Sequence, residues 1–399
     1  MNTLTLAWRY LWARPLASVL NLLLLSLGLA AITLLLLVRT QIDRAFERDL
    51  AGIDAVVGAK GSPLQLILSG VFHLDVPTGN IPLAEAQALA QDARVAQLIP
   101  LSLGDSYRGF RIVGTTRDYP AHYGAELTQG AWWQAPMEAV LGAQVARSTG
   151  LAVGSPFAGA HGLGAGGEEH GDEPYRVSGV LAPCGCVLDR LVLTSSESVW
   201  RVHEGEPEDA AERQALEAER EITLALVRYR SPLAAVTFPR YVNSATSLQA
   251  AAPALEITRL LRMVGMGTDV LRGFAAVLLL TAGLSVFIAL WSAVRERRAD
   301  LALLRMLGAP PRRVAGLLLA EALWLAALAT VLGLAAGHGL TGLLGWMLEN
   351  DPSVPLRGAL WLAEELWVPA LALTVAALAS ALPVLTAYRS SAVSLLNER

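Results

Sequence analysis

The chain has 399 residues, of which 54% are hydrophobic and 17% are charged, and its formal net charge at pH 7 is -4. Soluble domains carry roughly 25% charged residues, so this composition excludes a disordered chain and argues against a purely soluble enzyme. The small negative charge gives no support to nucleic-acid binding, which requires a basic surface.

The first apolar segment covers residues 16–38, which is long enough to cross about 30 Å of hydrocarbon. It follows residues 1–15, where Trp8, Tyr10 and Trp12 are typical of a membrane interface. A cleaved signal peptide is the alternative, but its apolar stretch would span only about 7–15 residues and end at a small-residue cleavage site. Because the run here is longer and is followed by charged residues, we expect an uncleaved transmembrane helix.

A long polar interval separates this segment from three further apolar segments. Residues 39–269 have the composition of a soluble domain, whereas 274–293, 314–335 and 366–385 are apolar enough to be membrane helices. We therefore predict a membrane α-helical protein of four transmembrane helices, with a large α+β extracytoplasmic domain inserted between helices 1 and 2.

Arginine residues determine the predicted orientation. The connection 294–313 is rich in arginine, whereas the connection 336–365 holds Arg357 alone among several acidic residues. Basic loops stay in the cytoplasm, so the arginine-rich connection, the N-terminus and the tail 386–399 are expected there. The inserted domain would then be periplasmic, and the chain a multi-pass protein of the inner membrane.

The polar interval shows alternating strand and helix patterns. Short β-branched or alternating runs predict strands at 53–58, 107–116, 175–181, 190–195 and 222–229. Helical patterns lie at 83–93, 208–220 and 232–244, and a further helix is expected from just after Pro253 toward the second membrane span. The Gly-rich segment 158–175 is expected to be a loop. This alternation predicts small sheets covered by helices.

Motifs of nucleotide-dependent and hydrolytic enzymes are missing from the sequence. No G-x-x-x-x-G-K-[ST] run is present, and the glycines at 162–167 neither follow a predicted strand nor open a helix. There is also no G-x-S-x-G or H-E-x-x-H pattern. We therefore expect no catalytic residue and no cofactor in this chain.

The most specific pattern lies in the arginine-rich connection. Residues 292–325 combine an Arg/Glu cluster, a short apolar helix that ends in L-x-x-L-G-A, further basic residues and the next membrane helix. This stretch resembles the FtsX/MacB family of ABC transporter permeases, and the closing segment 381–399 is similar to the end of that family. The matching residues are Arg295, Glu296, Arg297, Arg298, Leu304, Arg305, Leu307, Gly308, Ala309, Arg312 and Arg313. The order of one helix, an outer domain and three helices also resembles the family.

The resemblance implies a permease that performs no catalysis itself. Two copies, identical or paralogous, would sit in the lipid above a dimer of cytoplasmic ABC ATPase subunits that bind ATP and Mg²⁺. ATP hydrolysis would move the periplasmic domains, which act by mechanotransmission on a lipoprotein, peptide or antibiotic-like substrate, with a periplasmic partner protein as a further option. In such a domain, 45–118 and 230–262 would be the porter-like part and 119–225 the distal insertion. Alternatives are a signalling subunit that regulates a cell-wall hydrolase and a metal-linked transporter.

Residues of the arginine-rich connection are the candidates for ATPase coupling. An amphipathic helix there could insert its apolar stripe into a groove of a soluble partner, and Gly308 could end it with a positive φ. The alternative is a helix that lies among lipid headgroups. The candidates are Arg295, Arg298, Leu301, Leu304, Arg305, Leu307, Gly308 and Arg312.

Small residues and one acid are the candidates for packing in the membrane. Gly28, Gly333 and Gly337 would allow close helix contacts, within one subunit or between two. Glu321 lies two turns into the third span, where it could pair with a nearby arginine at the interface or contribute to helix–helix or ATPase coupling.

One apolar helical face in the outer domain has two interpretations. Leu64, Leu68, Val71 and Phe72 could belong to a core helix, or they could form a surface that contacts lipid or an acylated cargo.

Histidines and cysteines give weak indications of metal. His161 and His170 stand in the acidic, Gly-rich loop, where either solubility or metal binding could explain them. Cys184 and Cys186 are two residues apart, and such pairs seldom reach disulfide geometry. We expect two buried free thiols, with a thiolate metal pair as the alternative.

Overall fold

The computed structural model describes residues 3–162, 173–204, 210–296, 303, 305–348 and 356–389. The chain divides into two compact units. The helical unit comprises Met1–Asp43 and Val264–Arg399, and the α/β unit comprises Arg44–Met263.

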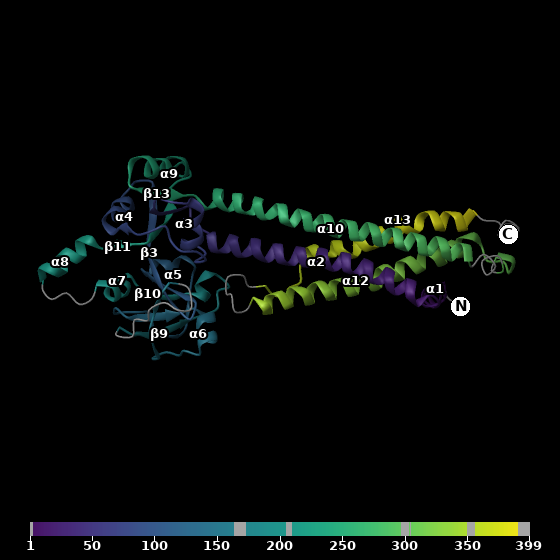
Figure 1. Cartoon of the computed structure of the whole chain (residues 1–399), viewed down its shortest axis with the longest axis horizontal. Coiled ribbons are helices and arrows are strands. Elements are labelled where there is room, and N and C mark those ends of the chain that lie inside the picture. Colours follow the sequence, from purple (N-terminus) through teal and green to yellow (C-terminus); the bar gives the residue numbers. More distant parts are fainter. Residues whose placement is uncertain are drawn as a thin grey trace. The chain divides into compact units, whose positions relative to one another are not determined.

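Long apolar helices build the helical unit, and they confirm the four predicted spans. The helices are α2 (Pro15–Leu50), α10 (Pro253–Glu296), α12 (Pro311–Met347) and α13 (Trp367–Arg389), which lie side by side (Figure 1). Four segments are long and apolar enough to cross a membrane: Pro15–Leu50, Asp269–Glu296, Pro311–Met347 and Ala363–Arg389. Helix α10 also confirms the expected helix from Pro253 into the second span.

A short N-terminal helix, which the sequence reasoning did not predict, completes this unit. Helix α1 (Thr3–Trp12) buries Ala7 against Leu317 and Ala320 of α12. The rings of Trp8 and Trp324 meet edge to face, with centroids 5.2 Å apart. Trp8, one of the aromatic residues expected at the membrane interface, therefore packs between α1 and α12.

Glycines allow α2 to approach its neighbours closely. A Cβ added to Gly333 would lie 2.7 Å from the Cβ of Leu29, and one added to Gly337 would lie 2.6 Å from the Cβ of Thr33. A Cβ on Gly28 would lie 2.9 Å from Cδ2 of Leu279. All three glycines selected from the sequence thus lie at helix contacts within the unit.

One large mixed sheet runs through the α/β unit. Among the described residues it has 11 strands, with the order β13-β1-β12-β3-β4-β10-β6-β9-β5 and with β7 and β8 paired to β9 and β3. The strands are β1 (Ala55–Ala59), β3 (Val95–Tyr107), β4 (Phe110–Thr115), β5 (Leu127–Gly130), β6 (Glu138–Leu141), β7 (Pro156–Phe157), β8 (Ala160–His161), β9 (Tyr175–Leu181), β10 (Val192–Ser195), β12 (Leu224–Tyr229) and β13 (Leu248–Ala251). Strands β2 (Ile81–Pro82) and β11 (Glu221–Ile222) pair separately.

Helices cover both faces of this sheet. Neighbouring residues of a strand point to opposite faces, so one strand contributes side chains to two different cores. Val56 packs in one core with α3, and Val57 packs in another core with α4 and α9. The helices of the unit are α3 (Pro63–Gly70), α4 (Leu83–Ala90), α5 (Asp118–His122), α6 (Ala143–Thr149), α7 (Ser196–Glu204), α8 (Ala210–Glu219) and α9 (Ala234–Ala245). A single helical turn of this unit lies at Val187–Arg190. Another lies at Ala363–Leu366, in the helical unit.

The sheet joins the segments expected to form the porter-like and distal parts. Strand β4 pairs in parallel with β10, and β12 lies between β1 and β3. Strand β3 was not predicted, since Pro100 and Gly104 interrupt its pattern and its register shifts near Leu103. Its position beside β12 is decided by pairing between distant segments of the chain.

Substitution of Gly333 tests the close approach of α12 to α2. We expect Gly333→Leu to lower the stability of the helical unit by about 1–3 kcal/mol, because the added side chain would overlap Leu29. Gly339→Leu is the matched control, since a Cβ at Gly339 meets no atom within 4 Å. The measurement is the fraction of detergent-purified protein that stays monodisperse after heating. Equal melting of the two variants would contradict the packing described.

Candidate functional site

Part of the arginine-rich connection lies among the described residues, and it exposes apolar side chains. Leu303, Met306 and Leu307 are 52%, 58% and 82% exposed. The amide of Leu307 donates to the carbonyl of Leu303 at 2.9 Å, which forms a helical turn, and Gly308 has a φ of 90°.

Basic residues flank this turn on both sides. Arg295 is exposed in the last turn of α10, and Arg312 is exposed in the first turn of α12, where Pro311 begins the helix. Three of the coupling candidates, Arg298, Leu301 and Leu304, lie outside the described residues. Of the described candidates, Leu307 presents an exposed apolar side chain between cationic ends, beside Leu303 and Met306, which were not among the candidates.

A mostly apolar cavity with a few polar side chains lies within the helical unit, close to its N-terminal helix. Its volume is about 270 Å³, and its lining includes Tyr10, Arg14, Asn21, Ser285 and Glu321. The hydroxyl of Ser285 donates to Oδ1 of Asn21 at 2.5 Å, which links α10 to α2. Glu321 is only 5% exposed, so this carboxyl is buried within the helical unit, where it lines the cavity.

The connection before α13 folds back onto α12 and α2. Nε2 of His338 lies 2.9 Å from Oε2 of Glu365, and Nδ1 of the same ring lies 2.7 Å from the carbonyl oxygen of Gly358. The amide of Arg357 donates to Oε1 of Gln41 at 2.7 Å. These polar contacts fix residues 356–366 against the ends of two membrane helices.

The apolar face of α3 and the turn that follows belongs to the core of the α/β unit. Val71 and Phe72 are 0% and 3% exposed, and Leu64 and Leu68 are half-buried. Phe72 meets Phe46 edge to face, with ring centroids 4.8 Å apart. The interpretation of these residues as a lipid or cargo surface is therefore wrong for Val71 and Phe72, because the sheet side of α3 buries them.

The two cysteines form a disulfide, which corrects the expectation of free thiols. Cys184 and Cys186 are bonded, with their Cα atoms 5.2 Å apart. Gly185 between them has a φ of 64°, a backbone conformation that brings the flanking residues together without a Cβ clash. Oδ2 of Asp189 accepts the amide of Gly185 at 2.7 Å, and its Oδ1 accepts the amide of Cys184 at 3.0 Å.

His161 lies beside two residues that the sequence reasoning did not select. Nδ1 of His161 is 3.2 Å from Oδ1 of Asp105, and Nε2 of His203 is 3.7 Å from Oδ2 of the same carboxylate. His170 lies outside the described residues. Asp105 and His203 carry no local motif. The pairing of β8 with β3 brings Asp105 opposite His161, and the packing of α7 brings His203 to the same carboxylate.

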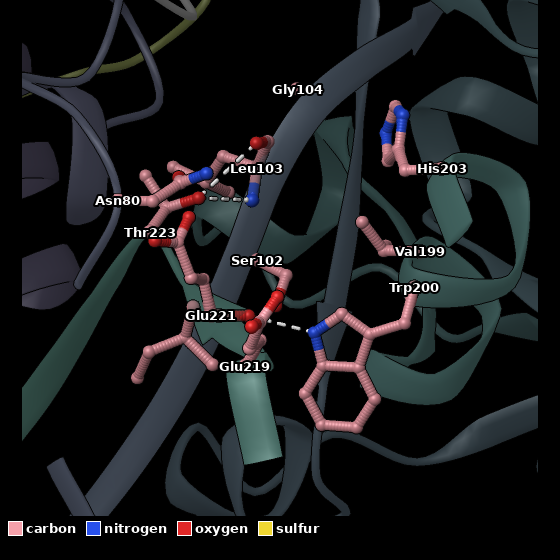
Figure 2. A pocket seen from close by; sticks show the side chains of 11 residues that line it. Asn80, Ser102, Leu103, Gly104, Val199, Trp200, His203, Glu219, Glu221 and Thr223 are labelled. Atoms are coloured by element: carbon pink, nitrogen blue, oxygen red, sulfur yellow. Dashed lines mark hydrogen bonds between the residues drawn. The ribbon is translucent and has the colours of Figure 1, made fainter. Parts of the chain in front are cut away.

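A pocket adjoins this cluster in the α/β unit. The volume of the pocket is about 380 Å³. Figure 2 shows its lining residues, with His203 at one side. Its polar lining includes Asn80, Glu219 and Glu221, and Nε1 of Trp200 donates to the backbone carbonyl of Glu221 at 2.7 Å (Figure 2). The pocket is thus acidic, and it opens between α7 and β3.

One buried histidine has a strongly altered environment. His73 is 8% exposed and its Nε2 lies 2.9 Å from the hydroxyl of Tyr119. Burial lowers the pKa of His73 well below its usual range, and the charges of Arg111 and Arg190 lower it further. The imidazole is therefore neutral at pH 7.

Architecture and site together define a class of protein. The chain has one apolar helix, an α/β domain and then three apolar helices, with an arginine-rich turn before the third span. This is the organisation of a multi-pass membrane protein with a large inserted domain.

Comparison with known families identifies the group. The chain matches the MacB-like periplasmic core domain over residues 18–232 and the FtsX-like permease C-terminal domain over residues 272–392. The chain therefore belongs to the FtsX/MacB-like permeases, and it is an ABC transporter permease of that type in the inner membrane. No curated protein sequence matches it.

Two solved structures match about half of this chain at low sequence identity. The periplasmic region of MacB from Actinobacillus actinomycetemcomitans is 14% identical with a TM-score of 0.35, and the match covers 53% of this chain and 95% of that one. The extracellular domain of the noncanonic ABC-type transporter YknZ from Gram-positive bacteria is 11% identical with a TM-score of 0.31, covering 50% and 98%.

The buried His73 predicts a loss of stability in acid. Because its pKa is lowered in the folded state, the unfolded chain takes up the proton first as the pH falls below 6.5. Stability from this group is therefore complete above pH 6.5, and it falls by at most about 1.4 kcal/mol per pH unit below that value.

His73→Asn isolates this contribution, since asparagine tolerates the positive φ of 55° at this position. Melting temperatures of the full chain between pH 7.5 and 5 are the measurement. We expect a smaller decline for His73→Asn than for the native chain, and identical slopes would show that His73 does not titrate on unfolding.

Proposed function

We propose that this permease transmits the energy of ATP hydrolysis from a separate cytoplasmic ATPase dimer to its α/β unit. The observation that carries this proposal is the turn that ends in Leu307 and Gly308. It exposes apolar side chains between clusters of arginine, within the region that matches the FtsX-like permease domain. An exposed apolar stripe with cationic ends suits a groove on a soluble partner better than it suits water.

The chain carries the features needed to pass movement onward from such a turn. Arg295 lies at the end of α10, and the first residues of α12 follow Pro310 directly, so a force on the turn would act on both helices. Helix α10 continues without a break from Pro253 to Glu296, so its two ends are joined by an uninterrupted hydrogen-bonded backbone. Such a helix transmits displacement along its length.

The proposed orientation puts the arginine-rich connection and both termini in the cytoplasm and the α/β unit in the periplasm. The strongly unequal distribution of arginine between the two short connections supports it. In the proposed assembly two permease copies, identical or paralogous, associate in the membrane above the ATPase subunits. The cargo is handled outside the membrane as a lipoprotein, a peptide or an antibiotic-like compound, for export or extraction.

Substitution of the exposed turn tests ATPase coupling. We expect R305E/L307D to weaken association with the ABC ATPase that copurifies with the full chain by about 30-fold, because an interface anchor contributes roughly 2 kcal/mol. The readouts are the amount of ATPase retained and the rate of ATP hydrolysis per permease. R357E is the matched control, since it reverses an exposed arginine in the other connection.

Normal assembly and hydrolysis in R305E/L307D would place the ATPase contact elsewhere. A loss of assembly in R357E as well would indicate a general effect of charge reversal rather than docking at the turn.

Thiol labelling tests the orientation. The native cysteines are bonded to each other, so single variants M306C and W361C provide the reactive thiols at side chains that are 58% and 68% exposed. We expect a membrane-impermeant maleimide added to cells with a permeabilised outer membrane to label W361C and to spare M306C until the inner membrane is opened. The reverse pattern would invert the proposed topology.

A further inference from the structure

Three side chains from distant segments converge at one edge of the large sheet in the α/β unit. Asp105 lies on β3, His161 on β8, and His203 near the end of α7. In the antiparallel pairing of β3 with β8, Asp105 is directly opposite His161. Each residue offers one ligand atom, and these atoms all lie within 4.8 Å of one another.

Two separations between these atoms are close to the edge length of a small coordination polyhedron. Bonds of about 2.0–2.2 Å at tetrahedral angles put two zinc ligands about 3.3–3.5 Å apart. Nδ1 of His161 is 3.2 Å from one oxygen of Asp105, and Nε2 of His203 is 3.7 Å from the other. All three ligand atoms lie within 4.8 Å of one another, so side-chain rotations that shorten the longer separations would let one ion contact all three.

The carboxylate of the cluster is buried and its two histidines are partly exposed, as in a site that an ion can enter from solvent. The Asp105 side chain is only 3% exposed, whereas the side chains of His161 and His203 are 48% and 38% exposed. The two imidazole rings stack with their centroids 5.2 Å apart and their planes 24° apart.

We propose that Asp105, His161 and His203 form a Zn²⁺ site on the α/β unit. Two imidazoles and one carboxylate are ligands that Zn²⁺ accepts, whereas Ca²⁺ and Mg²⁺ prefer oxygen ligands alone. Three protein ligands leave the fourth tetrahedral position open, as in zinc sites that bind water or a further ligand.

An acidic pocket lies next to the proposed metal site. His203 also lines the acidic pocket of about 380 Å³, together with Glu219 and Glu221 (Figure 2). The carboxylates there favour the approach of a cation to the ligands. A bound ion would also join β8 to α7 and so tie one wall of the pocket to the edge of the sheet. Metal binding at this site does not depend on ATPase coupling.

Metal titration of the full chain tests the site. The tag-free protein in detergent is stripped with a chelator, and Zn²⁺ is then titrated in competition with a chromophoric chelator. We expect one tight site per chain in the native protein and at least about 100-fold weaker binding in H161N and in H203N, since changes in the surroundings of a zinc ligand alone cost about 10–100-fold. H122Q is the matched control, because its ring contacts the carbonyl of Ala51 in the same unit, away from the cluster.

D105N tests the buried ligand. The melting temperature is a second readout, which separates an effect on metal binding from an effect on folding. Zn²⁺ should raise the melting temperature of the native protein and of H122Q but not of the three ligand variants, while the metal-free melting temperatures of H161N and H203N stay at the native value. Co²⁺ bound in place of Zn²⁺ should show the absorption of a four-coordinate nitrogen and oxygen site. Equal zinc affinity in the native chain, H161N and H203N would overturn the proposal, as would the absence of tight binding in the native chain.

Discussion

The helical unit depends on the return of α2 to the three helices that follow much later in the chain. Lipid tails are as apolar as leucine side chains, so the hydrophobic effect alone cannot hold membrane helices together. Close van der Waals contact does so instead, and it requires small residues where backbones meet. Gly333 and Gly337 of α12 supply this contact with Leu29 and Thr33 of α2, and the buried polar pair Asn21 and Ser285 adds a hydrogen bond between α2 and α10.

The α/β unit is organised by pairing between segments far apart in the sequence. Strand β12 inserts between β1 and β3, and the hydroxyl of Thr223, just before β12, accepts the amide of Leu103 at 2.8 Å. The bulge in β3 beyond Leu103 re-aims the side chains that follow. Asp105 lies in that stretch, which explains how a buried carboxylate comes to face His161 and His203 at the sheet edge.

The arginine-rich turn and this sheet edge illustrate two kinds of functional feature. The turn is local: charge, apolar spacing, Gly308 and the two following prolines occupy one short stretch, so its character can be recognised in the sequence. The histidine cluster is assembled by tertiary structure, and neither Asp105 nor His203 has a distinguishing neighbour. His161 was selected for the acidic loop around it, yet its described partners come from β3 and α7 instead.

At some places the local sequence pattern allowed two environments, and at the cysteine pair the expected one was wrong. The apolar face that includes Val71 and Phe72 suits either a core or an exposed surface, and the position of the sheet beside α3 decided in favour of burial. The cysteine pair appeared too close for a disulfide, but the positive φ of Gly185 and the amide hydrogen bonds to Asp189 shape the loop so that the bond forms. The α1 helix was overlooked because its packing partner lies on α12.

By itself, the sequence determined the number and order of the membrane spans, the inserted α/β domain and the family of the permease. Those properties depend on segment length, apolar content and local motifs. Each of these features lies within one continuous stretch of the chain. Tertiary structure alone decided the strand order, the disulfide, the buried face of α3 and the meeting of Asp105 with two histidines. These depend on contacts between residues that are distant in the chain, because burial and proximity are set only when the sheet and the helices pack together.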